Sequence, residues 1–333
     1  IATELDISGD VDVDGTLETD AITLNGTSFI KLEGTNFTDS LLIGHATTGT
    51  LDAAEDNTGV GINALESLTS GDKNTALGHQ AGKAITTASQ NVYLGNLAGY
   101  QNTSSNFNIG IGDSALAGSD GSTASNVAIG ALALNVASGA NFNIAIGRDA
   151  GREVTTGDNN LLLGLDAGQT GSPGGAITTS NNNIVLGDEN ITSANVQVDW
   201  GIASDERDKT DFADLNIGLD FVKALEPITY YWDKRSKYGD KTADDYDLNA
   251  QTPDGTHKEP QLDVGFKAQE VETLEVAEGY KKEDKTNLLI TMTEDGKQYG
   301  MRYEKFVPIL VKALQELSTK NDALEARIKT LEG

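Results

Sequence analysis

The stretch Asn126-Val-Ala-Ile-Gly130, repeated seventeen residues later as Asn143-Ile-Ala-Ile-Gly147, decides the fold of this chain. The same unit, an Asn, three mainly aliphatic or small residues and a Gly, occurs eight times. The copies begin at Asn57, Asn74, Asn91, Asn108, Asn126, Asn143, Asn160 and Asn183. The steps between them are 17, 17, 17, 18, 17, 17 and 23 residues, and an insertion rich in Gly, Ser and Thr (171–180) lengthens the last one. Such a period is typical of a solenoid, whose coils must stack to bury a core.

The residue types within each unit predict a short strand followed by a turn. The first and third residues after the Asn are mostly large aliphatics, such as Val127 and Ile129, and the residue between them is often small. This alternation predicts a short strand whose large aliphatic side is buried. The closing Gly permits a positive φ at a turn, and we expect the Asn to bond its own backbone or to stack with the Asn of the next coil. An Ala seven residues after each of the first seven Asn residues indicates a second strand or a corner where backbones approach closely.

Upstream of the repeats, apolar and polar residues alternate from Leu5 to Leu24 with Gly between them, which predicts short strands and turns. Within this region, Asp10-Val-Asp-Val-Asp-Gly15 is similar to the opening of a calcium-binding loop. The twelfth position of such a loop would be Ala21 instead of a bidentate Glu. The alternation equally fits a strand with a solvated acidic face, and this is the interpretation that we favour.

The composition indicates a folded, strongly acidic chain. Of 333 residues, 38% are hydrophobic, none is Cys, and the formal net charge is −27. Residues 1–199 contain 23 acidic and 5 basic residues, a difference of −18, which argues against nucleic acid or anionic membranes as partners. No apolar run approaches the roughly 18 residues needed to span a bilayer, so we expect no membrane insertion. Because Ile1 is not preceded by Met, we expect a processed product or a fragment of something longer.

The repeats resemble the head repeats of trimeric autotransporter adhesins, and similar repeats occur in phage tail fibres. The resemblance covers roughly residues 57–187 and rests on the Asn-Val-Ala-Ile-Gly and Asn-Ile-Ala-Ile-Gly units. It implies a trimeric β-roll in place of a globule. A monomeric β-solenoid shares the same period and stays open as an alternative.

Downstream of residue 200 the sequence predicts a small α+β module. Helical spacing over 217–225 ends before Pro227, and 228–232 is a strand candidate. Residues 264–272 run from strand into helix, and 288–293 and 298–303 flank an Asp-Gly turn typical of a hairpin. His257 lies in a charged, turn-rich excursion with no second His or Cys nearby, so we predict neither a metal site nor a cofactor.

The C-terminal residues follow a heptad pattern that predicts a coiled-coil seam. Its a and d positions are Val307, Leu310, Leu314, Leu317, Asn321, Leu324, Ile328 and Leu331. Asn321 at an a position would specify register at some cost in stability, and identical chains are the expected partners. An amphipathic helix packed on its own domain is the alternative, and the heptads alone do not distinguish a dimer from a trimer.

Three motifs carry a second resemblance. Ser204-Asp-x-Arg-x-Lys209 is followed by Gly265-Phe-x-Ala-Gln-Glu-Val271 and by Tyr303-x-x-Phe-x-Pro-x-Leu310. Together they resemble the intramolecular chaperone auto-processing domain at the C-terminus of phage tailspikes, tail fibres and endosialidases. The resemblance covers about residues 200–333. It implies a domain that trimerises, guides the folding of the β-rich fibre upstream, and then cuts itself off just before the Ser, using a Ser and a Lys.

Carried over to this chain, the resemblance implies that Ser204 is the nucleophile, that Lys209 is its base, and that the cut falls between Ala203 and Ser204. A Ser needs a base to take its proton, and a Lys can serve only when it is desolvated. In one continuous helix, five residues at about 100° each would place the two side chains on different faces. The pair therefore needs a non-helical turn or a Lys from a neighbouring chain. In the simpler alternative, Ser204 only caps a helix.

The expected architecture is a mainly β repeat shaft followed by a small α+β domain that ends in a long coiled-coil helix. We expect its segments to be 1–50 (short strands), 51–199 (β-roll), 200–303 (chaperone) and 304–333 (helix). The predicted function is a homotrimeric phage tail fibre or spike segment, assembled in the host cytoplasm and carried on the virion, that cleaves itself once at most. A host-surface receptor or other tail proteins are the expected partners besides the chain itself. The alternative is a non-cleaving, receptor-binding adhesin that keeps its C-terminal domain as the tip.

Overall fold

A computed structural model describes residues 22–24, 27–31, 36–44, 48–241, 243 and 245–333. The chain divides into two compact units, Ile1–Leu161 and Leu162–Gly333. The acidic stretch from Asp10 to Gly15, with its calcium-loop alternative, lies outside the described residues. No helix in the described part of the chain is long and apolar enough to span a bilayer.

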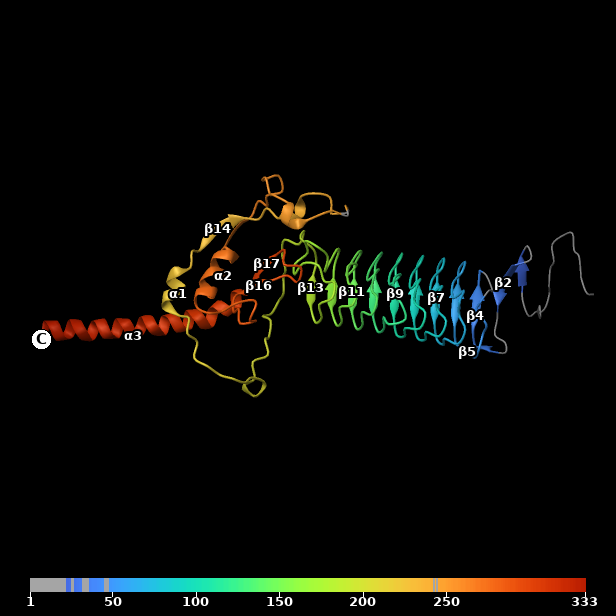
Figure 1. Cartoon of the computed structure of the whole chain (residues 1–333), viewed down its shortest axis with the longest axis horizontal. Helices are drawn as coiled ribbons and strands as arrows, with labels where there is room; N and C mark the ends of the chain where they lie inside the picture. The colour runs from blue at the N-terminus through green and yellow to red at the C-terminus, as the bar shows by residue number, and fades with distance from the viewer. Residues whose placement is uncertain (1–21, 25–26, 32–35, 45–47, 242, 244) are drawn as a thin grey trace, which may run out of the picture. The chain divides into compact units, whose positions relative to one another are not determined.

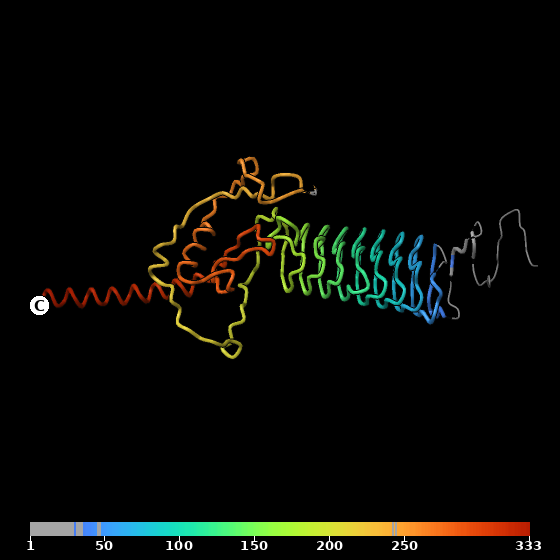
Figure 2. The backbone as a smooth tube through the Cα atoms, in the orientation of Figure 1, coloured from blue at the N-terminus to red at the C-terminus, as the bar shows by residue number. Residues whose placement is uncertain are grey.

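The first unit is a β-solenoid. Its strands are β1 (Ile22–Leu24), β2 (Thr27–Lys31), β3 (Phe37–Thr38), β4 (Leu41–Ile43), β5 (Ala54–Glu55), β6 (Thr58–Val60), β7 (Thr75–Leu77), β8 (Val92–Leu94), β9 (Ile109–Ile111), β10 (Val127–Ile129) and β11 (Ile144–Ile146). From β4 to β11 each coil adds one strand that pairs in parallel with the strand before it (Figures 1 and 2). The solenoid that the repeat period predicts is confirmed.

The Gly that closes each unit lets neighbouring coils approach. At Gly95 the φ angle is +137°, a region that L-residues with a Cβ rarely adopt. A Cβ at this position would lie 2.4 Å from the carbonyl oxygen of Gly112 in the next coil. The predicted role of the Gly is therefore confirmed, and close backbone packing adds a second reason for it.

The Asn residues stack into a buried ladder. The side-chain amide of Asn126 donates to Asn108 Oδ1 in the preceding coil (3.2 Å) and to the carbonyls of Ala124 (3.0 Å) and Ala140 (2.9 Å). The same side-chain link joins Asn74 to Asn57, Asn91 to Asn74, Asn143 to Asn126 and Asn160 to Asn143. Because an unpaired buried amide costs about 1–3 kcal/mol, the ladder holds successive coils in one register.

The strands bury the side opposite to the one predicted. The middle residue of each strand faces the interior, and Ala128, Ala145 and Tyr93 are fully buried. The flanking aliphatics point outward, so that Ile144 and Ile146 are each 40% exposed. The prediction that the first and third residues are buried within the chain is therefore wrong. The interior of a 17-residue coil is narrow, and it is filled by the small middle residues together with side chains from the turns, such as Leu116.

The second unit begins with β12 (Leu161–Leu163) and β13 (Ile184–Leu186) and continues as an α+β module. The module comprises η1 (Glu206–Asp208), α1 (Leu219–Ala224), β14 (Ile228–Tyr231), η2 (Arg235–Lys237), η3 (Leu248–Ala250), β15 (Leu262–Gly265), α2 (Ala268–Ala277), β16 (Ile290–Met292), β17 (Tyr299–Met301), η4 (Tyr303–Lys305) and α3 (Phe306–Glu332). Strands β14 and β15 pair antiparallel, and so do β16 and β17. The predicted α+β class, hairpin and terminal helix are confirmed.

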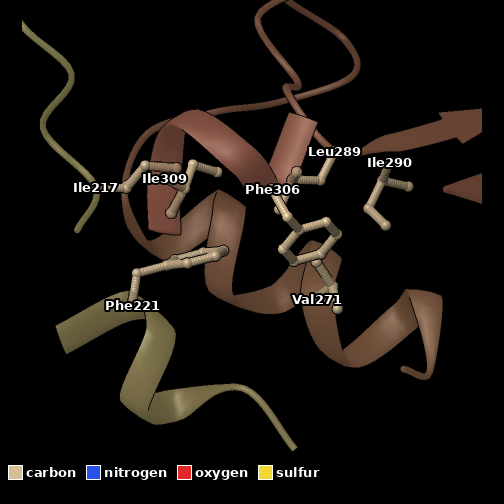
Figure 3. Close-up of a cluster of buried hydrophobic side chains, with 7 residues drawn as sticks. All are labelled: Ile217, Phe221, Val271, Leu289, Ile290, Phe306 and Ile309. Carbon is tan, nitrogen blue, oxygen red and sulfur yellow. The ribbon is translucent and has the colours of Figure 1, made fainter. Parts of the chain in front are cut away.

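One apolar cluster joins the three helices of this module (Figure 3). Phe221 on α1, Val271 on α2 and Phe306 on α3 meet there with Ile217, Leu289, Ile290 and Ile309, and all seven are at most 6% exposed. Stacking of Phe266 on Phe306, with ring centroids 5.2 Å apart, extends the cluster toward β15. Since these residues lie far apart in sequence, the cluster holds the start of α3 to the rest of the module.

Candidate functional site

Ser204 and Lys209 meet in one chain. Lys209 Nζ lies 2.6 Å from Ser204 Oγ and 3.1 Å from the carbonyl oxygen of Ser204. A single turn of 3₁₀ helix, η1, separates the two residues, and the backbone is extended on both sides of it: φ and ψ are −65° and 132° at Asp205, and −124° and 152° at Lys209. The two side chains thus meet within one chain, because a single 3₁₀ turn with extended backbone on both sides replaces a continuous helix.

Asp205 and Arg207 build this turn. The Asp205 carboxylate accepts from the backbone N–H of Arg207 (2.9 Å) and forms an ion pair with its guanidinium (2.6 Å). These hydrogen bonds hold the pKa of Asp205 below its ordinary value. Asp205, and not Ser204, is the N-cap of η1. The alternative in which Ser204 only caps a helix is therefore wrong, and its hydroxyl faces the lysine instead.

The arrangement has the parts of a nucleophile and a base. A hydroxyl within hydrogen-bond reach of an amine is the geometry that a Ser–Lys pair requires. Both side chains are exposed, however, as are all residues from Asn190 to Asp214. A Lys acts as a base only after desolvation, and the single chain provides no cover for this pair.

The predicted seam residues are exposed in the single chain, as is every residue of α3 from Leu317 onward. Among them Leu314, Leu317 and Leu324 are 67%, 51% and 58% exposed. The helix packs on its own module through a different stripe, formed by Phe306, Ile309 and Ala313. The self-packing alternative thus describes the first turns of the helix, and it leaves the a and d positions exposed in the single chain.

The sequence did not predict two carboxylate contacts, one buried at Glu275 and one half-buried at Glu316. Glu275, only 1% exposed, accepts hydrogen bonds from the backbone N–H groups of Leu288 (2.8 Å), Leu289 (2.6 Å) and Ile290 (3.2 Å). Glu316 on α3 accepts from the backbone N–H of Leu219 (2.8 Å) at the first turn of α1. Nothing in the local sequence separates these acids from solvated ones on the same helices, so only the packing could reveal them.

The substitution Glu275→Gln is expected to weaken the attachment of residues 288–290 to α2 by about 1–3 kcal/mol, because an amide replaces a carboxylate that accepts three hydrogen bonds. The amide hydrogens of Leu288, Leu289 and Ile290 should then exchange about 5- to 150-fold faster with deuterium. The exposed Glu278, the C-cap residue of α2, supplies the matched control, Glu278→Gln. Equal exchange rates in the two variants would show that Glu275 contributes nothing to the strand.

Comparison with known families supports the C-terminal resemblance. Residues 204–280 match the sequence model of the family described as chaperone of endosialidase. The match begins at Ser204 and includes α1, β14, β15 and α2. No curated protein and no solved structure matches the chain significantly.

Proposed function

We propose that this protein is the shaft and chaperone of a homotrimeric phage tail fibre or spike, because residues 204–280 match the chaperone-of-endosialidase family. It is assembled in the host cytoplasm, carried on the virion, and contacts a host-surface receptor or other tail proteins. The observation that carries the proposal is a pair of uncovered apolar surfaces, one on the solenoid and one on α3.

The solenoid surface is a row of aliphatic side chains on the outer face of the strands. In-register pairing aligns these side chains from coil to coil; they are Val92, Leu94, Ile109, Ile111, Val127, Ile129, Ile144 and Ile146. Ile109, Ile144 and Ile146 are exposed and the other five are half-buried in the single chain, and an aligned apolar surface of this kind marks an interface. Every copy of the chain carries the same row parallel to the stacking direction, so copies can cover one another around a common axis.

The surface on α3 supports the same partner. Its a and d side chains are exposed and repeat every seven residues, as a coiled coil requires. Asn321 interrupts the seam and donates to Glu325 of its own helix (3.3 Å). We infer three copies because the head repeats that the shaft resembles and the chaperone family both imply a trimer.

The cleavage step that we propose is an acyl shift followed by hydrolysis. Ser204 Oγ attacks the carbonyl carbon of Ala203 while Lys209 Nζ takes the hydroxyl proton. The C–N bond then breaks, and the lysine returns the proton to the nitrogen, which becomes the new α-amine of Ser204. Water hydrolyses the resulting ester, so Ala203 gains a carboxylate and the hydroxyl is restored. Assembly must desolvate the pair before Lys209 can act.

A second candidate function is an adhesin that keeps its C-terminal domain. The observation that favours it is the solvent exposure of Ser204 and Lys209 in the single chain. A pair that stays solvated in the assembly would not react, and the domain would remain as the tip of the fibre.

The oligomeric state tests the proposal. Sedimentation equilibrium of the Ser204→Ala chain, in which no cut can occur, should give three times the chain mass of 35.0 kDa. The two apolar surfaces are the physical reason, because three copies can bury both at once. A mass of one chain at micromolar concentration would contradict the trimer and favour the monomeric solenoid.

A further inference from the structure

The insertion that lengthens the last repeat, residues 171–180, lies in the second unit and contacts the C-terminal module. Glu189, just after this coil, is only 8% exposed and pairs with Lys241. Lys234 Nζ donates to the carbonyl oxygen of Glu189 (2.9 Å), and Lys237 contacts the side chain of Asn190. Three lysines within eight residues thus contact Glu189 and its neighbour Asn190.

A second contact joins the insertion to the hairpin of β16 and β17. Thr179 Oγ1 donates to Glu294 Oε1 (2.6 Å), and the backbone N–H of Ser180 donates to Glu294 Oε2 (3.2 Å). These hydrogen bonds lower the pKa of Glu294, with the bond from Thr179 contributing most. Thr179 belongs to the insertion and Glu294 to the hairpin turn, so a second segment of the module binds the same insertion.

Glycines in the insertion make this close approach possible. A Cβ on Gly171 would lie 2.8 Å from the Cβ of Ser236, and a Cβ on Gly175 would lie 2.8 Å from side-chain atoms of Thr293. The φ angles of the two glycines are +94° and +75°. The Gly-rich composition of the insertion therefore follows from the surface that it presents to the module.

The two parts of the module that contact the insertion, the lysine-bearing segment 234–241 and the β16–β17 hairpin, also contact each other. The Arg235 guanidinium donates to the carbonyl oxygen of Lys297 (2.5 Å) and to Asn249 Oδ1 (2.8 Å), and Lys297 lies 3.7 Å from the carboxylate of Asp247. The chain that links the last coil to the module, residues 190–214, is by contrast exposed throughout. Noncovalent contacts, and not this connection, therefore hold the module on the coil.

We propose that residues 171–190 are a docking surface for the C-terminal module, which stays bound to it after the connecting chain is cut. The partner is the module of the same protein. Its Lys241 pairs with the Glu189 carboxylate and its Lys234 donates to the Glu189 carbonyl oxygen. Its Glu294 accepts hydrogen bonds from Thr179 and Ser180. Rising ionic strength weakens the more exposed contact at Glu294 more than the buried Glu189–Lys241 pair, because salt screens exposed charges more strongly than buried ones. The natural cut of the connecting chain rests on the proposed function, but the binding does not.

The test uses a site for an added protease, placed after Ala194 in the full-length Ser204→Ala chain. The protein folds intact and is then cut, so neither half has to fold alone. On gel filtration the two fragments should co-elute at about 0.05 M NaCl and dissociate faster at about 1 M NaCl. Separation of the parent fragments at low salt would overturn the proposal.

A double variant identifies the contacts. Glu189→Gln with Glu294→Gln should speed dissociation at low salt at least tenfold. Asp199→Asn with Glu206→Gln removes the same charge from the exposed connection and should behave as the parent. Lys241→Gln tests the other partner of the Glu189 pair. Dissociation as slow as in the parent for both the acidic double variant and Lys241→Gln would also overturn the docking surface. A monomeric mass or an uncut wild-type chain would bear on the proposed function alone.

Discussion

Replacement of Ser204 by Ala is expected to leave a full-length chain of 35.0 kDa on a denaturing gel, where the wild type separates into residues 1–203 and 204–333. The hydroxyl is the atom that forms the ester in the proposed step, and no other group can replace it at that position. Loss of such a nucleophile lowers a rate by at least about 10³-fold. Mass spectrometry of the wild-type fragments should place the new N-terminus at Ser204.

Two further variants separate chemistry from folding. Lys209→Met removes the amine that lies 2.6 Å from the hydroxyl, and it should block cleavage as fully as Ser204→Ala. Thr210→Ala removes a neighbouring hydroxyl outside the pair and should leave cleavage intact. If wild type and Ser204→Ala both stay full length in the assembled fibre, self-cleavage is ruled out and the retained-tip adhesin becomes the better account.

The double substitution Leu317→Asp with Leu324→Asp is expected to abolish the trimer and to prevent native shaft formation during refolding. It would place two carboxylates of every helix in the apolar seam, and an unpaired buried carboxylate is strongly unfavourable. Sedimentation should then give single chains, and the shaft should lose its resistance to protease. The effect is all-or-none because the same seam is disrupted in all three copies.

Its matched control is Thr319→Asp with Ala326→Asp. These residues have the same seven-residue spacing on α3, lie on the side away from the seam and are exposed. The control adds the same charge and should still assemble. A trimer that survives in the seam variant would show that the solenoid rows alone hold the copies together, whereas failure of both variants would point to a general effect of charge on the helix.

The sequence was most informative where one local rule repeats. Gly95 and its equivalents need a positive φ, and Asn126 and its equivalents form links in one ladder, so both can be recognised from spacing alone. The heptads of α3 and the Asp-Gly hairpin between β16 and β17 are local in the same sense. For the candidate site, the motif identified Ser204 and Lys209, but their spacing left two routes open.

The sequence by itself thus determined the β-solenoid and the α+β module with its terminal helix, and its resemblance to a chaperone family proposed Ser204 and Lys209 as the candidate pair. Only the tertiary structure decided which side of each strand faces inward, because alternation looks the same whether the aliphatics line a coil or an interface. It also decided that η1 brings Lys209 to Ser204, that Glu275 is buried, and that the insertion at 171–180 meets the module. Each of these depends on residues distant in sequence, whose contacts no local pattern encodes.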